Sequence, residues 1–229
     1  MKRSRPIVLA GIGTALLGNY WVLEGALAKR TDPTASWISD LAARTEAFGW
    51  RFELLEIASG LAVVGFALLL LGRIGERSPV IRAGLLALAA EGVFTVAGGA
   101  LPLSCAETLD PTCSFHYDAL DVLHATAEFV ATTATVLAFA LIGLGQARVD
   151  SRRTASSVTF VIGAVWLVLT ALTGLSYLNG DVESVKGLLQ RASQAMFGAW
   201  LILLGVWGSD SDAGRQPVPH RVGDRARVP

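Results

Sequence analysis

Apolar residues along this chain gather in six long stretches that are separated by polar segments. The stretches run approximately over residues 7–28, 53–72, 82–103, 119–145, 158–178 and 187–208. An α-helix needs about 20 mostly apolar residues to cross the hydrocarbon core of a bilayer, and it satisfies its own backbone hydrogen bonds there. The pattern therefore predicts an all-α fold, an integral membrane bundle of six transmembrane helices, as one domain over residues 1–208.

Two terminal regions differ from this pattern. The tail, residues 209–229, has almost nothing apolar to bury, and we expect it to be a disordered cytoplasmic segment. The basic start of the chain also fits a signal peptide that is cleaved after residues 26–28, which read Ala-Leu-Ala. Because the apolar run from Ile7 to Leu23 is longer than a usual signal core, we expect the first helix to be retained.

The longest link between stretches, residues 29–52, has a helical pattern of its own. Asp32 is a suitable helix N-cap, Pro33 suits the first turn, and Gly49 can end the helix. Its apolar residues recur at three- or four-residue multiples, at Trp37, Leu41, Phe48 and Phe52. This spacing predicts one interfacial helix on the outer membrane surface. Asp40, in the polar part of the link, either is simply solvated or belongs to an outer site.

Composition supports a membrane protein, and the placement of charge gives the bundle an orientation. The chain is 52% hydrophobic and 17% charged, whereas a soluble domain carries roughly 25% charged residues. Most of its 19 Lys and Arg residues fall on one side, at Lys2, Arg3, Arg5, Arg73, Arg77, Arg82, Arg148, Arg152, Arg153, Arg215, Arg221, Arg225 and Arg227. Short loops rich in Lys and Arg stay cytoplasmic. We therefore expect the chain to lie in the plasma membrane with both termini on the cytoplasmic side. These basic flanks form no patch for nucleic acid.

The only two cysteines, Cys105 and Cys113, lie between the third and fourth stretches, on the expected outer side. An oxidising compartment permits a disulfide, which would stabilise so short a loop by about 2–3 kcal/mol in the chain-entropy model. A metal site that uses both thiolates with His116 is the alternative. Zinc sites usually have their cysteines about two to four residues apart, so the spacing here favours the disulfide.

Polar residues form a stripe at the start of the fourth stretch. At 100° per residue, Asp121, His124 and Glu128 lie within an arc of about 60°, and Thr132 and Thr135 continue the same face. With a rise of 1.5 Å per residue, Glu128 lies roughly 15 Å below the start of this helix, near the middle of the membrane. Because charged groups are expensive in lipid, we expect this face to point into the bundle.

Two further charged residues have depths that match the stripe. Glu91, in the third stretch, reaches about the level of Glu128 from the other side, and Arg191, in the sixth, enters near the level of Asp121. An acidic residue at the centre of a membrane helix costs about 2.5–3.5 kcal/mol on insertion scales. We therefore expect these groups either to line an outward-opening polar cavity or to form a buried network that only fixes helix register.

The residue types in the stripe leave a metal site open as a weak alternative. Asp121, His124 and Glu128 are metal-ligand types on one face, but three ligands from one helix rarely complete a site without donors from another. No phosphate-binding glycine loop, serine hydrolase order or zinc-protease motif occurs in the sequence. We therefore expect no bound cofactor.

The sequence resembles a known family in two regions. One is "ASWISDLAARTEAFGWRFELLEIASGL", with Ser39-Asp40-Leu41 after the segment that contains Pro33, and the other runs from Pro102 to His124. Both resemble the bacterial and archaeal membrane proteins of domain of unknown function 998. This resemblance implies a six-helix bundle without a settled activity. A more distant similarity, to the Frag1/DRAM/Sfk1 membrane proteins, points to roles linked to lipids.

These observations lead to one leading hypothesis and two alternatives. The first is a multi-pass membrane protein whose cavity binds or moves a lipid head group or a small polar ligand. Its candidate residues for ligand binding or proton relay are Asp40, Glu91, Asp121, His124, Glu128 and Arg191. The alternatives are a membrane-embedded hydrolase, with or without a metal, that uses His124 and the carboxylates, and a structural or interaction protein with an inert polar network.

Overall fold

The computed structural model describes residues 4–28, 31–106, 108, 113, 118–149, 152–179 and 185–210, and within them every regular element is a helix. The elements are α1 (Arg5–Gly18), η1 (Tyr20–Leu23), α2 (Glu24–Leu27), η2 (Ser39–Ala42), α3 (Gly49–Ile74), η3 (Gly75–Arg77), α4 (Pro79–Gly99), α5 (Ala119–Ala147), α6 (Arg153–Asn179) and α7 (Lys186–Ser209). The predicted tail from residue 211 onward and His116 lie outside the described residues.

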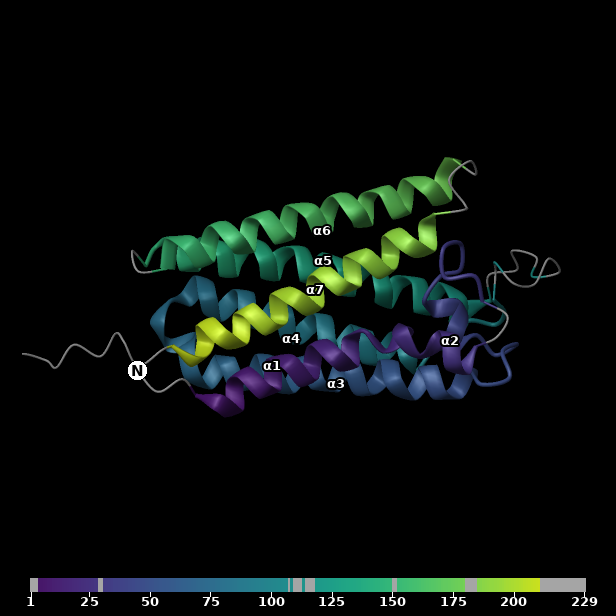
Figure 1. Cartoon of the computed structure of the whole chain (residues 1–229), viewed down its shortest axis with the longest axis horizontal. Helices are drawn as coiled ribbons and strands as arrows, with labels where there is room; N and C mark the ends of the chain where they lie inside the picture. Colours follow the sequence, from purple (N-terminus) through teal and green to yellow (C-terminus); the bar gives the residue numbers. More distant parts are fainter. Residues whose placement is uncertain are drawn as a thin grey trace, which may run out of the picture.

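The six long helices form a ring that follows the order of the sequence. Each of α3, α4, α5 and α6 packs against the next helix along the chain, and both α7 and α3 pack against α1, which closes the ring. Figure 1 shows the helices side by side along the long axis of the molecule, with the start of α1 at one end and α2 at the other. Short connections between long helices produce this up-and-down order.

The two ends of the ring differ in composition. One end, the basic end, carries Arg5, Arg73, Arg82, Arg148, Arg152 and Arg153 at helix termini. The other end, the loop end, contains α2, the link of residues 31–48 and the described residues that follow α4. The charge asymmetry seen in the sequence therefore separates the two ends of the molecule in space.

Five helices are long and apolar enough to cross a membrane, and there are six such spans if the bent pair at the start of the described chain counts as one. That pair joins Arg5–Gly18 to Tyr20–Leu27 at an angle of 54°. The continuous first span that the sequence predicts is therefore broken. At the break the Asn19 side chain donates to Ala15 O over 2.8 Å and accepts from Trp21 Nε1 over 3.1 Å. Such local side-chain bonds compete with helix propagation.

The interfacial helix predicted between Asp32 and Gly49 is not formed. Within residues 31–48 only the 3-10 helix η2 occurs, and Asp32 caps a turn by accepting from Thr34 N over 2.9 Å. The segment instead packs into the loop end, where Ser36, Ile38, Asp40, Leu41, Ala42 and Ala43 are buried. Tertiary burial has overridden the local periodicity, because both faces of this segment meet protein.

Apolar side chains cover the outside of the ring and fill its basic half. Large apolar residues are exposed along α1, α3, α4, α5 and α6, for example Leu9, Leu16, Leu61, Val93, Phe129, Val161 and Leu172. On α7 such residues are exposed only in the first turn. Such a surface suits lipid rather than water, and the chain is a multi-pass membrane protein by this criterion and by its spans.

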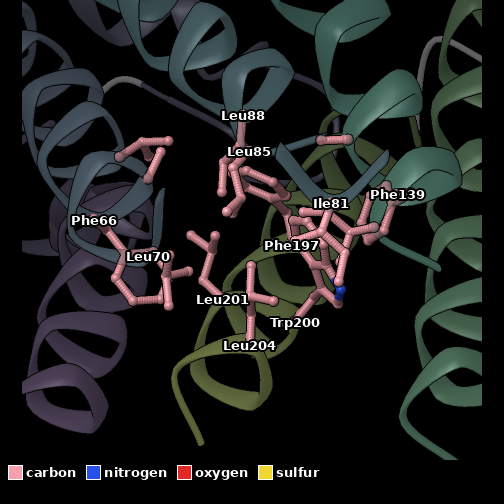
Figure 2. Close-up of a cluster of buried hydrophobic side chains, with 14 of the residues drawn as sticks. Phe66, Leu70, Ile81, Leu85, Leu88, Phe139, Phe197, Trp200, Leu201 and Leu204 are labelled. Atoms are coloured by element: carbon pink, nitrogen blue, oxygen red, sulfur yellow. The ribbon is translucent and has the colours of Figure 1, made fainter. Parts of the chain in front are cut away.

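Inside the ring, one apolar cluster fills the half nearer the basic end. Figure 2 shows it around Phe66, Leu70, Leu85, Leu88, Phe139, Phe197, Trp200, Leu201 and Leu204. The Trp200 ring lies 4.3 Å from that of Phe139, centroid to centroid, and Trp200 is fully buried. This cluster fills the interior toward the basic end.

Candidate functional site

A small polar cavity lies between the apolar cluster and the loop end. It offers about 50 Å³ for the centres of water-sized molecules, which is room for a few waters or a small ion. Its polar lining comes from Asn19, Tyr20, Ser39, Glu56, Ser59, Glu91, Thr95, Glu128, Gln190 and Gln194. Val63, Phe197 and Leu201, which also belong to the apolar cluster, line it as well.

Three glutamates from three neighbouring helices meet at this cavity. Glu56 lies seven residues after the start of α3, Glu128 nine after the start of α5, and Glu91 eight before the end of α4. At 1.5 Å per residue, all three lie about 10–14 Å below the loop-end termini of their helices. The sequence predicted this depth for Glu91 and Glu128, but it did not select Glu56 as a site residue.

Glycines bring the three helices close enough for these carboxyl groups to meet. A Cβ atom built at Gly60 would lie 2.5 Å from Gly92 O, so α3 and α4 touch through their backbones beside Glu56 and Glu91. A Cβ atom at Gly98 would lie 2.6 Å from Glu128 Oε1 and 3.2 Å from Glu56 Oε1. The absent side chain at Gly98 therefore leaves the space that these two carboxyl groups occupy.

The hydrogen bonds of the three carboxyl groups are incomplete. Oε1 of Glu56 and Oε1 of Glu128 both lie beside Gly98, and Thr95 Oγ1 donates to Glu91 Oε1 over 3.1 Å. Two carboxylates in a low-dielectric site repel each other, so a proton or a bound cation stabilises the pair. Among the described residues, Glu56 Oε2 and Glu91 Oε2 are buried with no hydrogen-bond partner. Such groups require a proton, a cation or a bound polar molecule.

A broken helix forms one wall of the cavity. The break between α1 and η1 places Gly18, Asn19 and Tyr20 along it. Because the C-terminal end of a helix carries a partial negative charge, the end of α1 adds to the negative potential of the glutamates. Broken helices beside polar sites are also a recurring way in which membrane carriers bind ligands near the bilayer midplane.

Arg191 does not line this cavity, because it forms a buried ion pair with Glu24. Its Nε donates to Glu24 Oε1 over 2.9 Å and its Nη2 to Glu24 Oε2 over 2.5 Å, while Nη1 donates to Ser36 O over 2.8 Å. Both side chains are nearly inaccessible to solvent, with exposures of 3% and 6%. The guanidinium joins α7, α2 and the link of residues 31–48, and its charge is balanced there.

Asp121 and His124 both hold the connection between α4 and α5. Asp121 accepts from Ser104 N over 2.8 Å and from Ser104 Oγ over 2.7 Å. His124 Nδ1 lies 2.9 Å from Leu101 O and 3.2 Å from Gly98 O. Because carbonyl oxygens only accept, Nδ1 carries the proton and caps the C-terminus of α4. The polar stripe of α5 is thus divided. Asp121 and His124, nearer the loop end, contact the connection between α4 and α5, and Glu128 lies at the cavity.

We expect Asp121→Asn to lower the free energy of unfolding by about 1–3 kcal/mol, because the amide replaces a charged acceptor and turns a donor toward the Ser104 donors. Unfolding in mixed micelles with a rising fraction of denaturing detergent, followed by circular dichroism, measures this change. The matched control is Asp118→Asn. Asp118 is exposed and caps the same helix through Leu120 N and Asp121 N, so its loss should cost less. Equal stability of Asp121→Asn and the unaltered protein would contradict the assigned role.

Asp40 is fully buried at the loop end, above the cavity. Its Oδ2 accepts from Trp37 N over 3.0 Å and from Thr108 Oγ1. The neighbouring Ile38 N donates to Gln190 Oε1 over 2.7 Å, which ties the link to α7. Asp40 therefore stabilises the segment that covers the cavity at the loop end. Its neighbours Ile38 and Ser39 line the cavity and form this roof.

The structure also bears on the cysteine and metal predictions. Cys105 and Cys113 lie at disulfide-bonding distance, with their Cα atoms 5.9 Å apart. Within the described ranges, no group of three or more His, Cys, Asp or Glu residues is placed to hold a metal ion. Asp121, His124 and Glu128, the weak metal candidates, thus share a helix face without sharing a coordination centre.

Of the candidate residues taken from the sequence, Glu91 and Glu128 line the cavity, whereas Asp40, Asp121, His124 and Arg191 bind neighbouring segments around it. Sequence reasoning missed Glu56 as a site residue. Its signal was present: Glu56 lies one helical turn before Gly60, so an acidic group and a close helix approach share a face of an apolar helix.

Comparison with known proteins identifies a family. The model of a family described as "Protein of unknown function (DUF998)" matches residues 9–207, which include four of the long helices and most of α1 and α7. No curated protein and no solved structure matches the chain. The similarity to the Frag1/DRAM/Sfk1 proteins stays a prediction.

Proposed function

This chain belongs to the family of proteins of unknown function DUF998, and from its cavity we propose that it is a membrane carrier that binds a small, positively charged ligand and exchanges it for protons. The two processes share one site, the carboxyl groups of Glu56, Glu91 and Glu128. Protonation neutralises these groups and releases the ligand, and loss of protons restores the charge that attracts it.

The observation that carries this proposal is the pair of buried carboxyl oxygens without partners. Glu56 Oε2 and Glu91 Oε2 have none among the described residues, although Glu56 is 6% and Glu91 8% exposed. A network that only fixed helix register would satisfy its own polar atoms, because an unpaired buried acceptor costs roughly 1–3 kcal/mol. Both glutamates line a cavity that has room for a small partner.

The size and charge of the cavity limit the ligand. About 50 Å³ of space for water-sized molecules suits a small ion or a compact ammonium group rather than a whole lipid head group. Its lining contains three carboxyl groups and no Lys or Arg, and the nearby Arg191 is already paired with Glu24. Negative charge in a low-dielectric environment favours a cation.

We place the loop end outside and the basic end, with both termini, in the cytoplasm of a cell with this chain in its plasma membrane. The Arg-rich helix ends at the basic end support this orientation, as does the cysteine pair at the loop end. In that orientation the cavity lies nearer the outer surface, under the roof formed by Ile38 and Ser39. The apolar cluster below it supports a state that is closed toward the cytoplasm.

The hydrolase alternative has less support. Its metal-dependent version needs a ligand cluster, and the described part of the chain contains none. Its metal-free version needs His124 as a base; Nδ1–H of that ring donates to the end of α4, which leaves Nε2 to accept a proton, but His124 does not line the cavity where the three carboxyl groups meet. No observation favours it over a carrier.

The test uses purified protein in liposomes that contain a pH-sensitive dye. With a proton gradient imposed, small cations are added in turn, namely Na⁺, K⁺, ammonium, methylammonium and guanidinium, and proton release is followed. We expect release with at least one cation, and a loss of at least about tenfold in Glu56→Gln, Glu91→Gln and Glu128→Gln, since a neutral amide exchanges no proton. Absence of release with every cation, in protein that remains folded, would overturn the proposal.

Two variants make this test specific. Glu53→Gln removes the same charge from α3 but does not line the cavity, and it should keep its activity. Gly98→Ala changes no charge, yet its methyl group would displace the Glu56 and Glu128 carboxyl groups, which are the mobile ends of flexible side chains. We expect Gly98→Ala to stay folded and to lose exchange. If it exchanged cations normally, the paired geometry would be irrelevant to function.

A further inference from the structure

A second and larger pocket lies at the loop end, on the outside of the ring. It has a volume of about 420 Å³ and is formed by the end of α2, the end of the link and the first turn of α3. Leu27, Ala28 and Phe52 give it an apolar floor, and Glu46, Phe48 and Arg51 give it a polar and aromatic side. The cavity and this pocket have no lining residue in common.

The positively charged side chain of Arg51 is held in place at this pocket by two aromatic rings. The Arg51 guanidinium carbon lies 4.5 Å from the centroid of the Phe48 ring and 5.4 Å from that of the Trp50 ring. Stacking of this kind restrains the side chain while leaving its N–H donors available, and guanidinium donors match the oxygens of a phosphate. Arg51 therefore presents restrained guanidinium donors of the kind that bind phosphate.

The pocket lies at the loop-end terminus of α3, a helix long and apolar enough to cross a membrane. Arg51 is in the first turn of α3, a membrane-spanning helix, and Trp50 and Phe48 beside it are 55% and 45% exposed. Exposed aromatic residues at a helix end mark the boundary between lipid and water. One helical turn further along α3, Leu54 is 56% exposed.

We propose that this pocket binds the head group of an anionic phospholipid, with Arg51 on its phosphate. The acyl chains run down the exposed apolar face of α3 past Leu54, and the glycerol region covers Phe48. Arg51 and Glu46 are the charged residues of the lining, and the guanidinium of Arg51 supplies the donors for the phosphate. Glu46, in the same wall, suits a head group with hydroxyl donors, such as that of phosphatidylglycerol.

This site is separate from the proposed carrier function. The cavity has space for a few water-sized molecules, whereas the pocket has about eight times the volume and shares no lining residue with the cavity. Lipid can therefore bind here whether or not the cavity exchanges cations, and either proposal can fail alone.

The experiment is native mass spectrometry of the purified chain with phosphatidylglycerol and, separately, phosphatidylcholine of the same acyl chains. We expect phosphatidylglycerol to bind about tenfold more tightly, and Arg51→Gln to remove most of that preference. The control, Arg44→Gln, removes a charge from an exposed residue of the same link that does not line the pocket, and it should keep the preference. Equal loss in the two variants would reduce the effect to net charge and overturn the proposal.

A second variant tests the pocket without changing charge. Ala47→Trp places a large side chain at an exposed position of the pocket wall, and we expect it to weaken phosphatidylglycerol binding as Arg51→Gln does. Water-soluble glycerophosphoglycerol, added in excess, should fail to displace the lipid, because it lacks the acyl chains. Displacement by this compound at matched concentration, or unchanged lipid binding in Ala47→Trp, would overturn the assignment.

Discussion

Arg191→Gln lowers the free energy of unfolding by about 3–5 kcal/mol, which is the largest stability loss that we expect for a single substitution in this chain. The substitution removes both ionic bonds to Glu24 and the bond to Ser36 O, and it leaves the Glu24 carboxylate buried at 5% exposure without its counter-ion. Detergent-induced unfolding followed by circular dichroism measures the loss.

The double variant Arg191→Gln with Glu24→Gln separates the ion pair from its surroundings. It removes both charges while keeping two side chains that can hydrogen-bond, so it should recover a substantial part of the stability lost in Arg191→Gln. A double variant no more stable than Arg191→Gln would mean that the bonds to Ser36 O and Gly187 O, not the unpaired carboxylate, dominate the loss.

Gly60→Ala destabilises the crossing of α3 and α4 by about 1–3 kcal/mol. The new Cβ atom would lie 2.5 Å from Gly92 O and 2.7 Å from Val96 N. These are backbone atoms, which cannot rotate away as a side chain can, so the helices must separate. The separation also moves Glu56 away from Glu91, and cation exchange should fall together with stability.

Gly65→Ala is the matched control for Gly60→Ala. Gly65 lies in the same helix, and a Cβ atom there would meet nothing within 4 Å. Because Ala favours helix by about 1 kcal/mol over Gly, this variant should be as stable as the unaltered protein or more so. Similar losses at both positions would show that the close approach at Gly60 is not what makes its glycine necessary.

The long helices were predictable because their signal is local. Apolar length alone places a helix in lipid, and the observed α3 to α7 overlap the predicted stretches throughout. The first span and the long link were predicted less well. Asn19 breaks the first helix through bonds of its own side chain, and the link folds inward because Asp40 and Ser36 find partners on distant segments. Such partners are invisible in a helical periodicity.

The candidate site was predictable in part for the same reason. Periodicity put Asp121, His124 and Glu128 on one inward face, and depth put Glu91 near Glu128. Periodicity and depth do not predict that Asp121 and His124 bind the connection between α4 and α5. They also do not predict that Glu128 lies beside Glu56. That division depends on which glycines let helices approach, and so on pairs of residues far apart in the chain.

Membrane insertion, the positions of five long apolar helices and the basic ends of those helices could all be predicted from the sequence. These properties follow from composition summed over each stretch. Tertiary structure alone decided which buried charges are balanced and which are not. Arg191 reaches Glu24 across the fold, whereas the carboxyl groups of Glu56 and Glu91 end at a cavity. The free energy of a buried charge depends on its nearest partners, and only the packed helices supply or withhold them.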